Sequence, residues 1–254
     1  MSVEADLGSA LSRLPGWEHA VAEEMTGGQT NRSYLLQAGA CFAVLKIDAG
    51  ARAAPFSQRE NEAKLQSIAA EHGIAGPVLF AGDNLYLTEY LQGEVWSDAA
   101  LASDSNLGKL AAAMRTLHGL PLTGRTFDAH QAAVQYARQC DDANADKVRE
   151  CLRTIESVPP PRRLSCCHND LVAANIIATP ELKFLDWEYA CDNDPLFDLA
   201  TVVAHHRLGE DRANILLDAY FDGDGRHWRE SLQEQARLYD ALRWLWQAAR
   251  QPPA

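Results

Sequence analysis

The sequence predicts an α+β protein in two parts: an antiparallel sheet with one helix, then a mostly helical part. Short strand patterns separated by glycine-containing turns recur between residues 19 and 90. From Ser97 onward, amphipathic helical patterns replace them. This change of pattern near residue 92 predicts two domains, residues 1–91 and 92–254.

The first part begins with a short helical pattern over residues 4–13, which Pro15-Gly16 ends. Apolar patterning then predicts five strands and one helix. The strands are expected at residues 19–25, 33–37, 41–47, 78–81 and 85–90, and the helix at residues 58–72. Glycine in the turns permits a positive φ, so the first three strands are expected to form an antiparallel meander.

The second part is predicted to consist of helices. An amphipathic pattern covers residues 105–117, with leucines and a methionine on one face. A longer pattern covers residues 128–157, with a possible break at Asp141-Asp142, and prolines end it. Two further helices are expected at residues 197–205 and 230–250.

The composition, 47% hydrophobic and 23% charged, is that of a soluble globular protein. Acidic residues outnumber basic ones by 35 to 23, which argues against a nucleic-acid partner because such binding needs a basic face. The excess of acid instead favours a cationic partner. No apolar run approaches the roughly 20 residues of a membrane span, and no secretory signal pattern begins the chain. The sequence therefore predicts a cytoplasmic protein with no membrane partner.

The polar residues that suggest chemistry lie within residues 164–200. Two short apolar runs flank a turn, which predicts a hairpin of two strands. His168, Asp170 and Asn175 would lie at the mouth of one strand. Asp186 would end the partner strand, so two carboxylates and one amide would meet at one end of the hairpin.

Such a cluster of acids needs a cation, because like charges held close together raise each other's pKa. Oxygen ligands without cysteine or histidine suit Mg²⁺. Asn175 and Asp186 are therefore candidate metal ligands, and Asp170 is left to accept a proton. The spacing H-x-D-x-x-x-x-N, with Asp186 sixteen positions after Asp170, is the pattern of a kinase catalytic loop and its metal-binding Asp.

The chain resembles the kinase-like small-molecule phosphotransferases, which include aminoglycoside phosphotransferases and choline/ethanolamine kinases. The segments D-W-E-Y-A from Asp186 and N-D-P-L-F-D-L-A from Asn193 are most similar to bacterial choline/ethanolamine and thiamine kinases. The resemblance is strong over residues 164–200, fair over 26–93 and thin elsewhere. It implies a two-lobed protein-kinase-like fold and an enzyme that uses ATP with Mg²⁺.

The resemblance also implies which residues hold the nucleotide. Lys46, at the end of the third strand, would hold the α- and β-phosphates, oriented by Glu60 with Glu62 as the second choice. Five further residues match the family's nucleotide site: Gly27, Gly28 and Asn31 in a turn over the phosphates, and Thr88 and Tyr90, whose carbonyl and N–H would meet the adenine.

In the catalytic loop, the resemblance implies that Asp170 takes the proton of the acceptor hydroxyl. His168 would brace this loop, and Asp198 would bond to it from a following helix. The family commonly has a His or Gly within Val172-Ala173-Ala174, where this chain has none. A basic side chain that would contact the γ-phosphate is therefore missing from this loop or is supplied by another part of the chain.

The acceptor implied by the resemblance is a small cationic alcohol, with choline or ethanolamine first and thiamine or an aminoglycoside as alternatives. Aromatic faces bind such cations well, and nearby acids add negative charge. The candidate residues for this contact are Glu188, Asp192, Tyr239, Trp244 and Trp246. A non-catalytic nucleotide or small-molecule binder on the same fold is the alternative of another class. It is disfavoured because Lys46 and the three residues of the acid cluster are all present.

Three other features are not expected to carry chemistry. Residues 119–126, G-L-P-L-T-G-R-T, nearly fit a phosphate-binding loop, but Arg125 replaces the lysine and the motif follows a helix instead of a strand. His205 and His206 are adjacent and would point to different helix faces, so they form a poor metal pair. The six cysteines include no C-x-x-C pair, so they predict neither a zinc site nor a disulfide framework.

Overall fold

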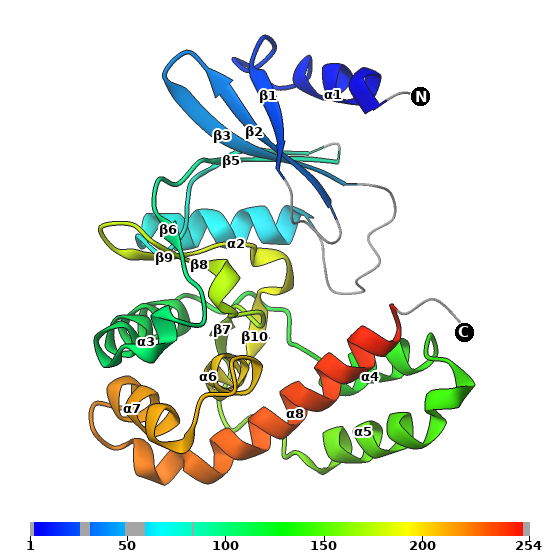
Figure 1. The fold of residues 1–254 in the computed structure, drawn as a ribbon, viewed down its shortest axis with the longest axis vertical. Helices are drawn as coiled ribbons and strands as arrows, with labels where there is room; N and C mark the ends of the chain where they lie inside the picture. Colours follow the sequence, from blue (N-terminus) through cyan, green and yellow to red (C-terminus); the bar gives the residue numbers. More distant parts are fainter. Residues whose placement is uncertain (1–2, 26–30, 49–58, 83, 251–254) are drawn as a thin grey trace.

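The computed structural model describes residues 3–25, 31–48, 59–82 and 84–250. A twisted sheet lies at one end of the molecule, most of the helices lie at the other, and helix α2 (Arg59–Glu71) lies between them (Figure 1). The predicted α+β, two-lobed arrangement is therefore confirmed. Within the described residues, no helix has both the length and the apolar character needed to cross a membrane.

The sheet of the first lobe has five strands in the order β1-β2-β3-β5-β4, each paired antiparallel with its neighbours. The strands are β1 (Val21–Met25), β2 (Asn31–Ala38), β3 (Cys41–Asp48), β4 (Val78–Gly82) and β5 (Leu85–Glu89). Leu36, Leu45 and Leu87 are almost fully buried between the sheet and helix α1 (Val3–Leu11). All five strands overlap the segments predicted for them. The register between neighbouring strands is fixed because one face of the sheet is buried.

Helix α2 packs against both lobes. Its buried residues Leu65 and Ala69 are four positions apart and belong to the large core that includes Met114. On the sheet side, the Tyr86 hydroxyl of β5 donates to Gln66 Oε1 at 2.9 Å. Helix α2 thus contacts both lobes.

Six α-helices build the second lobe: α3 (Asp104–His118), α4 (Ala129–Ala137), α5 (Ala145–Ser157), α6 (Pro195–His205), α7 (Glu210–Tyr220) and α8 (Arg229–Ala248). Helix α8 runs diagonally across this lobe (Figure 1). The predicted break at Asp141-Asp142 is confirmed: a 3-10 turn at Asp142–Asn144 separates α4 from α5. Helix α7 was not predicted.

Two small sheets position the polar residues of segment 164–200. Their strands are β6 (Glu94–Val95), β7 (Ser165–Cys167), β8 (Ile176–Ala178), β9 (Leu182–Phe184) and β10 (Cys191–Asn193). Strands β8 and β9 form the predicted hairpin, β6 extends it, and β7 pairs with β10. Just before β6, a Cβ on Gly93 would lie 2.4 Å from the carbonyl oxygen of Ala178, so only glycine permits this close approach.

Candidate active site

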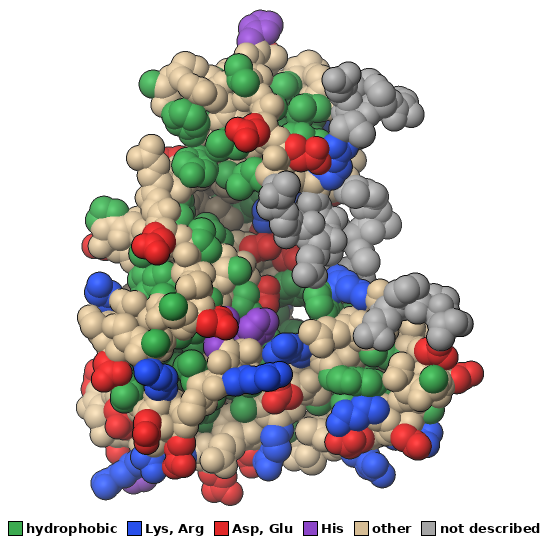
Figure 2. Space-filling view, viewed as in Figure 1, with side chains coloured by type: hydrophobic (Ala, Val, Ile, Leu, Met, Phe, Trp, Pro, Cys, Tyr) green, Lys and Arg blue, Asp and Glu red, His purple; other side chains and the backbone are tan. Residues whose placement is uncertain are grey.

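A cavity of about 470 Å³ opens between the sheet and the β8–β9 hairpin. Lys46 of β3 lines it together with Asp170, Asn175 and Asp186, and aromatic side chains of the helical lobe line its far end. We call it the acidic cavity. Figure 2 shows acidic side chains within the hollow between the two lobes. The structure therefore brings together the lysine and the three polar residues that the sequence singled out.

Asp198 of helix α6 holds the catalytic loop from behind. Its carboxylate is fully buried and accepts hydrogen bonds from His168 N at 2.8 Å and Asn169 N at 2.7 Å. His118 Nε2 lies 3.1 Å from the same carboxylate. A buried carboxylate is unfavourable without such donors, so the hydrogen bonds hold residues 168 and 169 firmly against helix α6. The predicted contact of Asp198 with the loop is observed.

Asn169, between His168 and Asp170, has a structural role that the sequence reasoning missed. Its φ is 64°, in the left-handed region, which asparagine tolerates better than most residues. Its Nδ2 donates to the carbonyl of Tyr189 at 3.0 Å, and its Oδ1 accepts from Asn193 Nδ2 at 2.8 Å. These bonds tie the turn of the loop to the segment after Asp186. An asparagine within the H-x-D motif was the available signal.

His168 is fully buried, and its ring centroid lies 5.2 Å from that of Trp187. Its Nε2 bonds to the carbonyl oxygen of Leu185 at 2.8 Å. Since a carbonyl can only accept, Nε2 carries the proton. The ring therefore holds the residue next to Asp186, a contact that fits the bracing role predicted for His168.

Asp170 and Asn175 are joined directly. Asn175 Nδ2 donates to Asp170 Oδ2 at 3.0 Å and to the Asp170 carbonyl at 2.9 Å. Burial raises the pKa of Asp170, and the nearby charge of Asp186 adds to this effect, whereas His168 and the hydrogen bond from Asn175 oppose it. The carboxylate thus becomes a better proton acceptor than an ordinary aspartate.

Asp186 meets the lysine of the sheet. Lys46 Nζ lies 2.7 Å from Asp186 Oδ1. Burial acts to lower the pKa of Lys46, but Asp186, then Glu62 and Glu188, outweigh it, so the net pKa lies above the ordinary value. Burial likewise acts to raise the pKa of Asp186, but Lys46 reverses this and the pKa is lowered. Both groups are therefore charged, and Asp186 has a left-handed φ of 61°.

The preference for Glu60 over Glu62 is corrected. Glu60 is exposed, whereas Glu62 is 3% exposed and its charge reaches Lys46. Glu62 Oε2 also accepts from Arg59 Nη1 at 2.7 Å, so its position is fixed. The two glutamates are two positions apart on α2 and so point to opposite sides of the helix.

Asp192 is corrected as a substrate residue. It lies in β10, is 2% exposed and does not line the acidic cavity. Its carboxylate accepts from Thr123 N at 2.7 Å and from Gly124 N at 2.9 Å. Asp192 therefore holds the loop that resembles a phosphate-binding motif, and that loop takes no part in the cavity.

At the far end of the acidic cavity, where the acceptor was expected, Glu188, Tyr239 and Trp246 line the wall, but Trp244 does not. Trp244 is half-buried and packs against the core between α4, α5 and α8, so its selection is corrected. Trp244 and Trp246 are two positions apart on α8 and so point to different sides of the helix, and the sequence alone did not show which side faces the cavity.

Two tyrosines that sequence reasoning missed also line this end. They are Tyr136 of α4 and Tyr189, which follows Glu188. Arg250 already covers one aromatic face, since its guanidinium carbon lies 3.7 Å from the ring centroid of Trp246. Trp246 therefore already stacks against one cation, although Arg250 itself does not line the cavity. The two tyrosines are far apart in the sequence, and only the fold brings them together.

The predicted adenine contacts are only partly compatible with the structure. The N–H of Tyr90 donates to the carbonyl of Phe42 at 3.1 Å, so the sheet already uses it and its selection is corrected. Thr88 lies in β5 opposite Val44. Gly27 and Gly28 lie outside the described residues, as does the side chain of Asn31.

The residues of the acidic cavity fit Mg²⁺. Because Asn175 Nδ2 is used by Asp170, its amide oxygen is the atom that remains for a cation. Asp186 adds carboxylate oxygens, and neither residue brings sulfur or nitrogen ligands. The Leu185 N–H donates to the Asn175 carbonyl at 2.9 Å, which keeps residues 175 and 186 at adjoining ends of the hairpin.

Comparisons with known proteins agree with this geometry. The model of the phosphotransferase enzyme family matches residues 21–245. Protein LicA of Haemophilus influenzae is 29% identical over 229 residues, which are 85% of this chain and 67% of LicA. A thiamine kinase of Salmonella typhimurium is 32% identical over 153 residues, 58% of this chain and 52% of that kinase. The chain thus spans about half the length of the thiamine kinase.

The fold comparison covers nearly the whole chain. The crystal structure of choline kinase LicA from Streptococcus pneumoniae has a TM-score of 0.81 at 20% identity, over 97% of this chain and 90% of that one. A LicA structure in complex with AMP has a TM-score of 0.79. The family model covers most of the sequence, and the residues of the catalytic motif meet in one cavity. The chain therefore belongs to the phosphotransferase enzyme family.

Proposed function

We propose that this phosphotransferase moves the γ-phosphate of MgATP to the hydroxyl of a small cationic alcohol, with choline or ethanolamine as the first candidates. The observation that carries the proposal is the 2.7 Å contact of Lys46 Nζ with Asp186 Oδ1, because it joins the sheet to the catalytic hairpin across one cavity. The similarity to a thiamine kinase makes thiamine the alternative, and an aminoglycoside is the third candidate.

Asp170 is proposed to take the proton of the acceptor hydroxyl. Asn175 holds one of its carboxylate oxygens at 3.0 Å, which orients the other for the acceptor. Phosphoryl transfer requires little covalent chemistry from the protein, so accurate positioning supplies most of the rate. The bonds from Asp198 to the two residues before Asp170 support such positioning.

Lys46 is proposed to hold phosphate oxygens of the nucleotide, with Glu62 keeping its ammonium in place. Asn175 and Asp186 would hold Mg²⁺, which neutralises phosphate charge when it is bound. Lys46 and Asp186 neutralise each other in this structure, and both are charged. The ammonium of Lys46 is suited to bind a phosphate anion, and the carboxylate of Asp186 is suited to bind a metal cation.

The acceptor is proposed to lie against the aromatic end of the acidic cavity. Tyr136, Tyr189 and Trp246 present aromatic faces there, and Glu188 adds a negative charge. A quaternary or primary ammonium group would stack on these aromatic faces. The acceptor's hydroxyl would then point toward Asp170, which lines the same cavity.

Steady-state phosphorylation assays with choline, ethanolamine, thiamine and an aminoglycoside test the proposal. We expect choline or ethanolamine to have a kcat/KM at least about tenfold above the others, a difference of roughly 1.4 kcal/mol in transition-state stabilisation. The Asp170→Asn variant, purified in the same way, controls for a contaminating kinase. MgATP binding without phosphate transfer to any acceptor would instead support the non-catalytic binder.

A further inference from the structure

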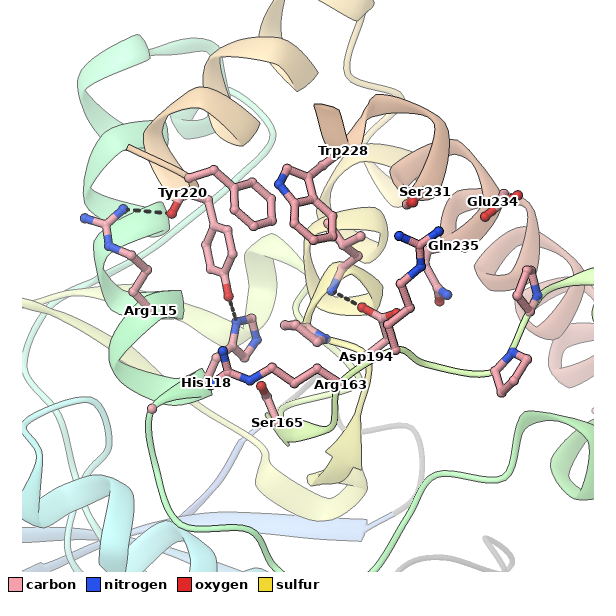
Figure 3. Close-up of a pocket in the computed structure, with 17 residues that line it drawn as sticks. Arg115, His118, Arg163, Ser165, Asp194, Tyr220, Trp228, Ser231, Glu234 and Gln235 are labelled. Atoms are coloured by element: carbon pink, nitrogen blue, oxygen red, sulfur yellow. Dashed lines mark hydrogen bonds between the residues drawn. The ribbon is translucent and has the colours of Figure 1, made fainter. Parts of the chain in front are cut away.

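A second cavity, of about 400 Å³, lies behind the catalytic loop. Figure 3 shows Tyr220, Trp228, His118, Asp194 and Gln235 around it, contributed by helices α3, α7 and α8 and by the segments between helices. Among the residues that the structure describes, its lining shares none with the acidic cavity. We call it the arginine cavity, after Arg115, Arg162 and Arg163, which line it.

Two of these arginines, Arg162 and Arg163, form no salt bridge within the described residues. The guanidinium of Arg115 donates to the carbonyl of Ala219 and lies 3.8 Å from Asp222. Arg162 and Arg163 are exposed and form no ion pair with any residue in the described part of the chain. Two acids, Asp194 and Glu234, also line the cavity, and Arg162 acts electrostatically on Asp194. The three arginines still leave an excess of positive charge, which in a chain with a formal net charge of −12 marks a local site for an anion.

A buried amide inside the same cavity also lacks a partner. Gln235 of α8 is 6% exposed and lines the cavity, and its Oε1 has no hydrogen-bond partner among the described residues. Leaving a buried acceptor unpaired costs about 1–3 kcal/mol, so native proteins usually satisfy such groups. A donor on a bound molecule would supply the missing bond. This observation is independent of the arginines.

The remaining wall suits a flat or apolar group. The rings of Phe221 and Trp228 are stacked, with centroids 4.6 Å apart and planes 5° apart. Pro195 and Leu196 add apolar surface at the start of α6. Pockets of a few hundred Å³ with apolar walls and a few polar groups are typical of small-molecule sites.

We propose that the arginine cavity binds a small organic anion, a phosphate monoester or a carboxylate. Its anionic group meets Arg162 and Arg163 at the mouth, and its flat or apolar part packs beside Trp228. A donor group on the molecule reaches Gln235. This site is separate from phosphate transfer and does not depend on the identity of the acceptor.

Isothermal titration calorimetry on the whole enzyme tests the site with three probes: phenyl phosphate, benzoate and benzyltrimethylammonium. We expect at least one of the two anions to bind with millimolar or tighter affinity. The double variant Arg162→Ala/Arg163→Ala should weaken that binding at least about tenfold, and added salt should weaken it in the wild type. Gln235→Glu, which adds a negative charge inside the cavity, should also weaken it.

Matched controls separate this cavity from other sites. Arg149→Ala/Arg153→Ala removes two exposed arginines of α5 and should leave anion binding unchanged. Benzyltrimethylammonium binding should be unaffected by Arg162→Ala/Arg163→Ala. The proposal is overturned if neither anion binds, if both bind the double variant as well as the wild type, or if Lys46→Met abolishes the binding, which would assign the anion to the acidic cavity.

Discussion

The acidic cavity and the arginine cavity lie on either side of one buried carboxylate, that of Asp198. On one side, three acids, Asp170, Asp186 and Glu188, outnumber Lys46 and Arg243. On the other, arginines surround stacked aromatic rings. Each cavity also contains the opposite sign, since Asp194 and Glu234 line the arginine cavity, so the two differ in their net balance of charge.

Asp198 holds the two sides by different means. Toward the acidic cavity it accepts from backbone N–H groups of residues 168 and 169, which any residue except proline could supply. Toward the arginine cavity it bonds to His118, whose Nδ1 in turn lies 2.7 Å from the Tyr220 hydroxyl. The catalytic loop is therefore fixed through its backbone, whereas the side chains of His118 and Tyr220 link Asp198 to the wall of the arginine cavity.

The largest effect is expected from Asp170→Asn, which should lower kcat at least about a hundredfold because the proton acceptor is lost. Its stability at neutral pH should not fall. The folded-state pKa of Asp170 is raised by burial, so its ionised form destabilises the fold, and that penalty is relieved only as the pH falls through the folded pKa. Steady-state kinetics and thermal unfolding on one preparation measure both quantities.

Asp192→Asn is the matched control for that substitution. The Asp192 carboxylate holds Thr123 and Gly124, so its loss should cost about 1–3 kcal/mol of stability. The kcat of the folded fraction should stay close to that of the wild type. A hundredfold loss of kcat in a fully stable Asp192→Asn enzyme would contradict the placement of this residue away from the acidic cavity.

On the nucleotide side of the acidic cavity, Glu62→Gln is expected to raise the KM for ATP roughly tenfold, since about 1.4 kcal/mol of charge interaction with Lys46 is lost. Glu60→Gln, on the exposed side of α2, should leave the KM within twofold of the wild type. The pair is measured by ATP titration at saturating acceptor. Equal effects of the two substitutions would contradict the selection of Glu62.

At the acceptor end, Trp246→Leu and Arg250→Ala should act in opposite directions. Loss of one aromatic face should raise the KM for a cationic acceptor roughly 2- to 30-fold, which corresponds to about 0.5–2 kcal/mol. Removing Arg250 uncovers that face and should lower the KM. Acceptor titrations at saturating ATP distinguish the two, and a KM raised by both variants would argue against a cation over Trp246.

On the arginine-cavity side of Asp198, Tyr220→Phe removes the hydrogen bond between the Tyr220 hydroxyl and His118, which in turn contacts Asp198. We expect kcat to fall by a factor of about two to five, because roughly one hydrogen bond is lost. The KM values for both substrates should not change, because Tyr220 does not line the acidic cavity. The split between kcat and KM is the readout. Unchanged kcat in a variant that folds normally would mean that the two cavities act independently.

The smallest expected effect is a shift in pH dependence. The apparent pKa of the acidic limb in the pH profile of kcat/KM should lie above the pKa of an ordinary aspartate, because burial raises the pKa of Asp170. Asn175→Ala removes a hydrogen bond that lowers this pKa, so the limb should move to still higher pH, whatever happens to the rate. A limb that moved to lower pH would show that another group governs it.

The sequence predicted those features that depend on local pattern. Apolar periodicity located the five strands and the catalytic hairpin, and motif spacing brought Lys46, Asp170, Asn175 and Asp186 to one cavity. The errors arose where the tertiary structure decides. The choice between Glu60 and Glu62 depends on which side of α2 faces the sheet, and Asp192 lies in a three-residue strand too short to recognise.

The arginine cavity could not have been predicted by local reasoning. Its groups come from residue 115 in α3, residues 162–163 between α5 and β7, and residues 220–235 around the start of α8. No spacing rule links such distant segments. The same holds for Tyr136 and Tyr189, which meet at the acceptor end only because α4 packs near the 3-10 turn that follows Asp186.

The contact between Gly93 and Ala178 has a consequence for movement between the lobes. The chain that leaves the sheet is bonded to the hairpin at once, since Trp96 N donates to the Ile176 carbonyl at 2.9 Å. Residues 73 and 74 are also bonded to the hairpin, so a movement of the sheet relative to the hairpin would have to bend the chain before residue 93 and after residue 74. Lys46 lies on the sheet side of this link, and Asn175 and Asp186 lie on the hairpin side, so such a movement would separate Lys46 from the proposed magnesium ligands without parting those two residues.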